Sequence, residues 1–311
     1  MDSIARTIDS CHVGKTGYAS REYAESLAEF GAVCELPRSE GWLLASQTPQ
    51  PDLYDATGCY PLFSCRNWSS LGADLKTLAE SLVSVRLVTD PFAEVDFQLL
   101  KETFPNVCYE YKQHFVTDLK LPLESVASSH HRRNARKALD AVTVQQETLN
   151  TTLLENWHSL YDNLIRRHEI DGIARFSASA FALQWKVPGL VVFSVADGND
   201  TCGMTLWYVQ GDVVYYHLAA YSDRGYELGA SFALFWTALK HFAEQGLRWA
   251  SLGAGAGVSA TASGLTRFKQ GWATDTRPVY FCGRILQPVE YANLSGHAPA
   301  GRNFFPAYRA A

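Results

Sequence analysis

Residues 222–231, SDRGYELGAS, have the composition of a tight connection between a strand and a helix. Glycine permits close backbone bends, and the first four N–H groups of a helix have no partner within it. Those donors and the positive end of the helix dipole attract anions. We therefore expect a pyrophosphate-like group here, although the spacing matches neither GxxxxGK[ST] nor GxGxxG and a simple connection is the competing interpretation. The candidate donor-binding residues are Arg224, Gly225, Gly229, Ala230 and Ser231.

Three side chains near this turn could take part in group transfer. Tyr216 and His217 lie near the end of the preceding apolar strand, and alternation predicts that only one of them faces a cleft. A histidine with a near-neutral pKa could act as general base, or it could be a hydrogen-bonded core residue. Lys269 follows a loop of small residues and could place a positive charge at an oxyanion. A solvated surface lysine is its alternative interpretation.

A basic cluster lies on the helix expected for residues 125–141. Its charges recur at i, i+1, i+4 and i+5, so they cover one broad helix face. We expect Arg132 and Arg136 to bind phosphates of an acceptor or of tRNA, or else to form a solvated face. Asp118, at the end of a long strand, could orient an amine or simply precede the helix. The cluster is Arg132, Arg133, Arg136 and Lys137.

The elements that must position these residues follow from periodicity. Three apolar runs joined by tight turns predict an antiparallel meander that ends in a strand over 213–221. Helices at 152–167 and 231–245 flank it, and a strand (247–253), a helix (265–272) and a strand (278–286) follow. The first half shows a looser order of strands and helices. The pattern predicts an α/β (α+β) fold with mixed, mostly antiparallel sheets flanked by helices, duplicated as units 1–125 and 126–311.

Composition excludes several classes. The net charge of −5 and pI of about 6.0 count against a protein that wraps nucleic acid. Seven irregularly spaced cysteines without a CxxC pair predict reduced thiols and no metal site. The N-terminus shows no secretory signal, and no apolar run reaches the roughly 20 residues of a membrane span. A cytoplasmic protein is expected.

Four segments together resemble the GNAT acyltransferases, and more narrowly their FemABX branch. They are ELGAS (227–231), LRWASLGAGAG (247–257), RFKQGWAT (267–274) and the FVTDLKLP…HHRRNARKA region (115–138). The third is similar to the FKxxF-Gly element of that branch, in which the lysine matching Lys269 is thought to stabilise the reacting carbonyl. The resemblance implies two packed GNAT-like units and acyl transfer to an amine of a small molecule or cell-envelope precursor.

In GNAT folds the strand before the turn separates from its neighbour, and its free amides hold the donor. The resemblance assigns that part to Leu218, Ala219 and Ala220. Acyl-CoA in the superfamily lies on a Q/R-x-x-G-x-G/A turn, from which Tyr226 and Ser231 depart. Acyl-CoA, for example acetyl-CoA, is the expected donor because the chain is acidic and lacks a coiled-coil insertion. Aminoacyl-tRNA, used within the FemABX branch, and a non-catalytic GNAT-fold binding protein are the alternatives.

Overall fold

The computed structural model of the protein describes residues 15–255, 264–296 and 304–310. Their strands form one 11-stranded sheet in the order β1-β2-β3-β4-β11-β5-β10-β9-β8-β7-β6. The strands are β1 (Ala32–Leu36), β2 (Gly41–Gln47), β3 (Tyr54–Gly58), β4 (Ser84–Val88), β5 (Val107–Asp118), β6 (Thr143–Gln146), β7 (Leu190–Asp197), β8 (Asp200–Gln210), β9 (Val213–Tyr221), β10 (Trp249–Gly253) and β11 (Asp275–Ile285). The mixed, mostly antiparallel α/β fold predicted from the sequence is confirmed.

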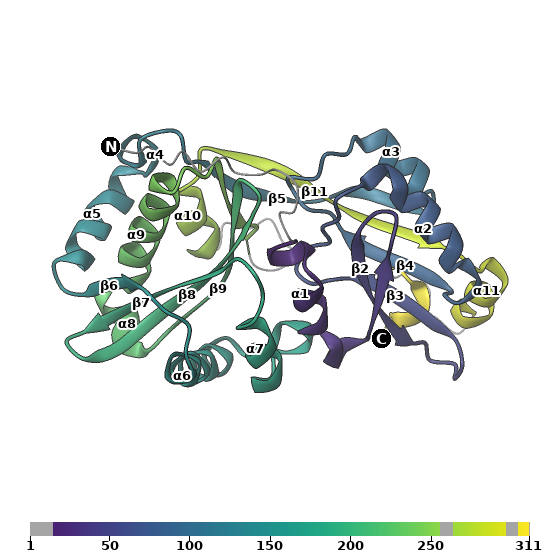
Figure 1. The fold of residues 1–311 in the computed structure, drawn as a ribbon, viewed down its shortest axis with the longest axis horizontal. Coiled ribbons are helices and arrows are strands. Elements are labelled where there is room, and N and C mark those ends of the chain that lie inside the picture. Colours follow the sequence, from purple (N-terminus) through teal and green to yellow (C-terminus); the bar gives the residue numbers. More distant parts are fainter. Residues whose placement is uncertain (1–14, 256–263, 297–303, 311) are drawn as a thin grey trace, which may run out of the picture.

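Helices cover both faces of the sheet (Figure 1). They are α1 (Arg21–Glu25), α2 (Leu71–Thr77), α3 (Phe97–Thr103), α4 (Leu123–Val126), α5 (Ser129–Leu139), α6 (Thr151–His168), α7 (Ala178–Gln184), α8 (Asp223–Leu228), α9 (Ala230–Glu244), α10 (Gly264–Gln270) and α11 (Pro288–Ser295). No helix in these described ranges is both long and apolar enough to cross a membrane.

The long strands β5 and β11 run through both halves of the molecule (Figure 1). β11 pairs with β5 over most of its length, and its last residues pair with β4 of the N-terminal half. The far end of β5 pairs with β10 of the C-terminal half. The halves therefore share a continuous sheet, with strands from each completing the other. The division at residue 125 stays a prediction.

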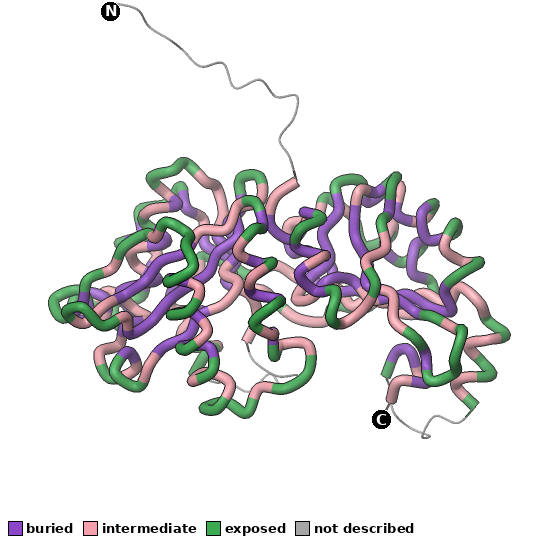
Figure 2. The backbone as a smooth tube through the Cα atoms, turned by 60° about the horizontal axis from the view of Figure 1, so that its bottom comes forward, coloured by how far each residue is buried: buried purple, intermediate pink, exposed green. Residues whose placement is uncertain are grey.

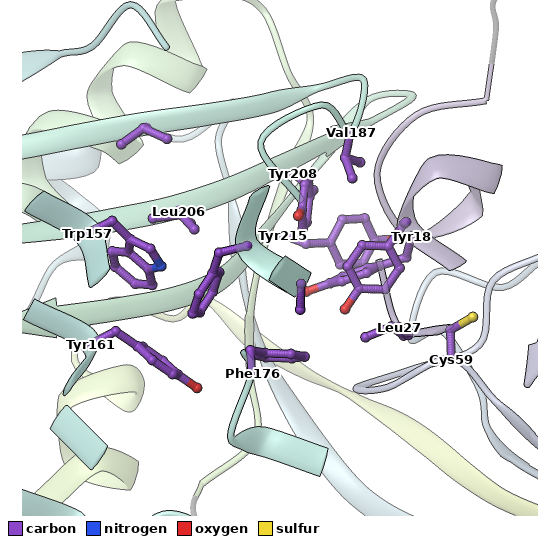
Figure 3. Close-up of a cluster of buried hydrophobic side chains, with 14 of the residues drawn as sticks. Tyr18, Leu27, Cys59, Trp157, Tyr161, Phe176, Val187, Leu206, Tyr208 and Tyr215 are labelled. Carbon is purple, nitrogen blue, oxygen red and sulfur yellow. The ribbon is translucent and has the colours of Figure 1, made fainter. Parts of the chain in front are cut away.

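In the C-terminal half, the predicted meander is present as β7, β8 and β9, which pair antiparallel. Phe235 and Phe242 of α9 pack on Trp207 at ring distances of 5.4 and 5.5 Å, which buries one face of the meander. Helix α6 places Trp157 and Tyr161 in a cluster on the opposite face, with Leu206 and Tyr215 among the residues that Figure 3 labels. Buried residues accordingly follow the strands in both halves, as Figure 2 shows. Truncating one such aromatic side chain costs about 3–5 kcal/mol.

Two predicted elements differ from the structure. The helix expected over residues 125–141 is divided into α4 and α5, because Ala127 is extended and the Ser128 hydroxyl caps α5 by accepting the N–H of His131. The turn expected before α9 is wrong: most of it is helix α8, whose N-cap Ser222 accepts the N–H of Gly225. Strand β1 and helices α7 and α11 were not predicted.

A buried carboxylate ties the two halves together. Asp90, just beyond β4, is 5% exposed and accepts the hydroxyl proton of Tyr215 on β9, with both oxygens 2.9 Å away. The N–H of Phe92 donates to the same carboxylate at 2.8 Å. Burial raises the pKa of Asp90, and these donors oppose that rise.

We predict that Tyr215→Phe lowers the free energy of unfolding by about 1–3 kcal/mol, because a buried carboxylate loses a donor. Urea unfolding measures the change. Tyr109→Phe is the matched control, since the Tyr109 side chain is 48% exposed. Equal stability of the two variants would contradict a structural role for the Asp90–Tyr215 contact.

Candidate functional site

Strands β9 and β10 separate part-way along their length. Their parallel pairing runs from Trp249↔Val213 to Ser251↔Tyr215 and then stops, while β9 continues to Tyr221. β10 ends at Gly253, whose φ of +75° suits glycine. We call the opening beyond Ser251 and Tyr215 the β9–β10 fork. The separation expected of a GNAT fold is therefore present.

One edge of β9 is unpaired at the fork. Leu218, Ala219 and Ala220 pair with β8 on their other edge, and no described strand pairs with them on the β10 side. An unpaired strand edge offers N–H and C=O groups to a ligand. These three residues are thus placed as the resemblance implies, and their contact with a donor remains a prediction.

A cavity of about 330 Å³ lies at the fork, between the two halves. The structure brings the three predicted catalytic residues, Tyr216, His217 and Lys269, into its lining. The cavity also receives side chains that the sequence did not single out, among them Lys112 and His114 of β5. Their spacing of two residues on an aromatic strand places them on one face, and that was the available signal. This spacing does not show which residues of other strands lie opposite Lys112 and His114 in the cavity.

Lys269 is buried at the base of the fork. Its side chain is 7% exposed, and its Nζ donates to the carbonyl oxygen of Ala254 at 2.7 Å. The ring of Tyr216 lies 5.5 Å from Nζ. Burial, and then the charge of Lys112, lowers the pKa of Lys269 to about 7. The group therefore changes its charge near neutral pH, which is unusual for lysine and typical of functional sites.

Tyr216 and His217 both line the cavity, so the prediction that only one of them faces it is wrong. The cavity lies where β9 has an open edge, and side chains from both faces of the strand reach that edge. The Tyr216 ring packs on Phe235 at 4.8 Å on the α9 side. The His217 ring lies among Tyr18, Tyr23 and Tyr208 on the other side.

The ring of His217 is hydrogen-bonded at both nitrogens. Nε2 lies 3.2 Å from Oε1 of Gln184, and Nδ1 lies 3.0 Å from the Tyr18 hydroxyl. The amide oxygen accepts, so Nε2 carries the proton and the Tyr18 hydroxyl donates to Nδ1. Burial lowers the pKa of His217 to about 3. The hydrogen-bonded core interpretation fits this geometry, and the role of His217 as a general base stays a prediction that the lowered pKa does not favour.

The predicted pyrophosphate turn does not have the expected shape. A Cβ added to Gly225 would lie 2.0 Å from the carbonyl oxygen of Cys202, so this glycine allows α8 to pack on β8. Arg224 pairs with Asp197 at 2.8 Å and with Glu227 at 3.2 Å. Gly229 has a φ of +65° and joins α8 directly to α9. Ala230, the first residue of α9, is fully buried, and Ser231 follows it half-buried.

The predicted substrate-binding residues lie outside the cavity lining. Arg132 donates through Nη1 to the carbonyl oxygens of Glu124 and Ala127, at 2.8 and 2.7 Å, and so closes the end of α4. Asp118 accepts from Nη2 of Arg248 at 2.8 Å. Arg136 is exposed on α5. Arg132 and Asp118 thus have hydrogen-bond partners within the protein that the sequence did not reveal.

A second hollow, of about 730 Å³, lies where α5, α9 and α10 meet. His130, Phe232 and Arg267 are among the residues that line it. His131 supports its floor, because its ring nitrogens lie 2.8 Å from the Ser128 hydroxyl and 2.9 Å from the carbonyl oxygen of Phe268. In the described part of the chain, no group of three or more His, Cys, Asp or Glu side chains could hold a metal ion.

Comparison with known proteins agrees with this geometry. Residues 127–270, which include Tyr216, His217 and Lys269, match the acetyltransferase (GNAT) domain family. No curated protein matches the sequence significantly.

Solved structures resemble nearly the whole chain. FemX has 16% identity and a TM-score of 0.64, over 88% of this chain and 93% of that one. The C-terminal DUF2156 domain of a putative lysylphosphatidylglycerol synthetase from Agrobacterium fabrum has 13% identity and a TM-score of 0.62, over 90% and 93%. L-PGS from Bacillus licheniformis has 13% identity and a TM-score of 0.59, over 88% and 94%. The fold of the chain thus resembles that of FemX, and residues 127–270 carry an acetyltransferase (GNAT) domain.

We predict that Gly225→Ala destabilises the protein by about 1–3 kcal/mol, because the added Cβ meets backbone that cannot move aside cheaply. Thermal or urea unfolding measures this. Gly72→Ala is the control, since a Cβ there has only ordinary contacts with Thr103. If Gly225→Ala were as stable as the control and bound donor more weakly, Gly225 would be a ligand-binding residue instead.

Proposed function

We propose that this chain catalyses N-acyl transfer, with the reaction at the β9–β10 fork. An amine in the 330 Å³ cavity attacks the carbonyl carbon of an activated acyl donor that lies along the open edge of β9. The new C–N bond forms a tetrahedral oxyanion, which collapses and expels the thiol or hydroxyl of the donor. The amine proton leaves with the departing group or through water.

The buried Lys269 is the observation on which this proposal rests. Its ammonium group has three donors, and among the described residues one acceptor uses them, the carbonyl of Ala254. Another can reach an oxyanion formed at the fork. Because Lys269 is buried, its charge stabilises the transition state more than it would at the surface.

Acyl-CoA is the proposed donor, supported by the acetyltransferase family match. The 730 Å³ hollow would hold the nucleotide end, with Phe232 as an apolar wall and Arg267 as a cation. The acceptor is proposed to be a small molecule or cell-envelope precursor in the cytoplasm.

Aminoacyl-tRNA is the second candidate donor, and helix α8 favours it. The segment that would cradle a pyrophosphate is helical, and its arginine, Arg224, is held by two carboxylates. A tRNA 3′ end does not require that cradle, and its terminal adenosine would suit the same outer hollow. The resemblance to the FemABX branch agrees with this alternative.

The donor is tested by incubating the protein separately with labelled acetyl-CoA and with labelled aminoacyl-tRNA, and by following binding and release of free CoA or tRNA. We expect wild type to bind acetyl-CoA and to release CoA faster than Lys269→Met does. Activity with aminoacyl-tRNA alone would establish the second candidate. Neither binding nor release with either donor would contradict acyl transfer.

We predict that Lys269→Met lowers kcat about 10²-fold or more, because it removes the charge at the oxyanion and retains most of the buried volume. Steady-state kinetics measures the change. Lys240→Met is the matched control, since Lys240 is exposed on α9 and its Nζ forms just a long surface ion pair, 3.9 Å from Oε1 of Glu244. Near-normal kcat in Lys269→Met would exclude this role for Lys269.

The pH dependence separates two roles of the same lysine. With its pKa lowered to about 7, the ammonium form of Lys269 is present below pH 7 and is lost as the pH rises through 7. If the charge stabilises the oxyanion, kcat has a descending limb near pH 7, and Lys269→Met lacks that limb. A limb that instead rises through pH 7 and disappears in the variant would make Lys269 a general base.

A further inference from the structure

The cavity at the fork carries unbalanced positive charge. Among the described residues that line it are two lysines, Lys112 and Lys269, and no aspartate or glutamate. The two histidines of the lining, His114 and His217, add no charge near neutral pH, because burial lowers the pKa of each. The nearby Asp90 is not in the lining and is held by Tyr215. Charges that are withdrawn from water are normally paired, so a cation-rich cavity of this kind suits an anionic ligand.

Lys112 is the cation that the proposed chemistry does not use. It lies half-buried on β5, with its Nζ 5.0 Å from the centre of the Tyr111 ring. None of the ion pairs formed by the described residues includes it. Lys269, by contrast, is already hydrogen-bonded to Ala254. The ammonium of Lys112 therefore remains available to a ligand in the cavity.

The electrostatic state of His114 agrees with this description. Burial, and then the charges of Lys269 and Lys112, lower its pKa to about 3. Its Nδ1 is buried and has no hydrogen-bond partner among the residues that the structure describes. Two residues apart on β5, His114 and Lys112 thus share a positive environment that no carboxylate in the described lining of the cavity neutralises.

We infer that the acceptor is an amine that also bears a carboxylate, and that Lys112 binds this carboxylate while the amine lies at the fork. The inference rests on the proposed function and names the substrate class of the same site. An α-amino acid and the C-terminal part of a short peptide have this chemistry in common.

Size and charge favour a carboxylate over a phosphate. At about 330 Å³, the cavity is at the lower end of the range for ligand sites and suits a molecule of amino-acid size. One ammonium balances one carboxylate, whereas a phosphate carries nearly two charges and usually needs several cationic donors. Tyr18, Tyr60 and Tyr111 in the lining provide aromatic walls for an apolar side chain.

Calorimetric titration of the whole protein tests the inference without a donor. The probes are L-leucine and L-tyrosine, each compared with its carboxamide, and the dipeptide glycyl-leucine. We expect each amino acid to bind wild type at least about 10-fold more tightly than its amide, because only the acid forms a charge-assisted hydrogen bond with Lys112. Tight binding of the dipeptide and not of the free amino acids would identify a peptide acceptor.

Variants assign the preference to one side chain. Lys112→Gln should lose the preference for the acid, Lys112→Arg should retain it, and the exposed Lys76→Gln should behave as wild type. In turnover, Lys112→Gln should raise the acceptor KM about 10-fold with little change in kcat. Equal binding of acid and amide to wild type, no binding of any carboxylate probe, or an unchanged preference in Lys112→Gln would overturn the inference. Because binding is measured without donor, a failure of acyl transfer is seen separately as loss of turnover with intact acid preference.

Discussion

The separation of β9 from β10 is the constraint on which the site depends. While the strands pair, their backbone groups satisfy one another, and beyond Ser251 and Tyr215 those of β9 must find another partner. The same separation admits side chains from both faces of the sheet into one cavity. It also allows the Lys269 ammonium to be buried against the carbonyl of Ala254, where burial brings its pKa near neutrality. A ligand backbone or amide chain along β9 would complete the interrupted pairing.

Strands β5 and β11 pair with strands of both halves, and β5 forms the side of the cavity opposite β9. Because β5 begins beside the N-terminal half and ends against β10, its residues Lys112 and His114 reach a site whose other members belong to the C-terminal half. The hydrogen bond from Tyr215 to Asp90 joins the N-terminal half to β9, the strand whose edge is open at the fork. Donor and acceptor functions can therefore lie on different halves and still meet at one place.

Periodicity predicted the meander, α6 and α9, because each has apolar residues that recur with the period of its own element and pack on one face. The family-like FK motif also led to Lys269. Helix α8 was missed because its glycine indicated a turn, although Gly225 is required there by the close carbonyl of Cys202. Arg132 was predicted to bind phosphate because the sequence does not show that the helix is interrupted at Ala127 and Ser128. This interruption leaves carbonyl oxygens at the end of α4, and Arg132 donates to them. Lys112 could not be placed, since the pairing of β5 with β11 joins residues far apart in the sequence.

The central claim is that the open edge of β9 holds the acyl donor. Amide hydrogen exchange of the whole protein, with and without a non-reactive analogue of the donor that supports transfer, tests it most directly. We predict slower exchange at Leu218, Ala219 or Ala220 on binding, and unchanged exchange in the β7–β8 turn around Gly198. Saturating donor analogue that leaves the exchange of these β9 amides unchanged would contradict it.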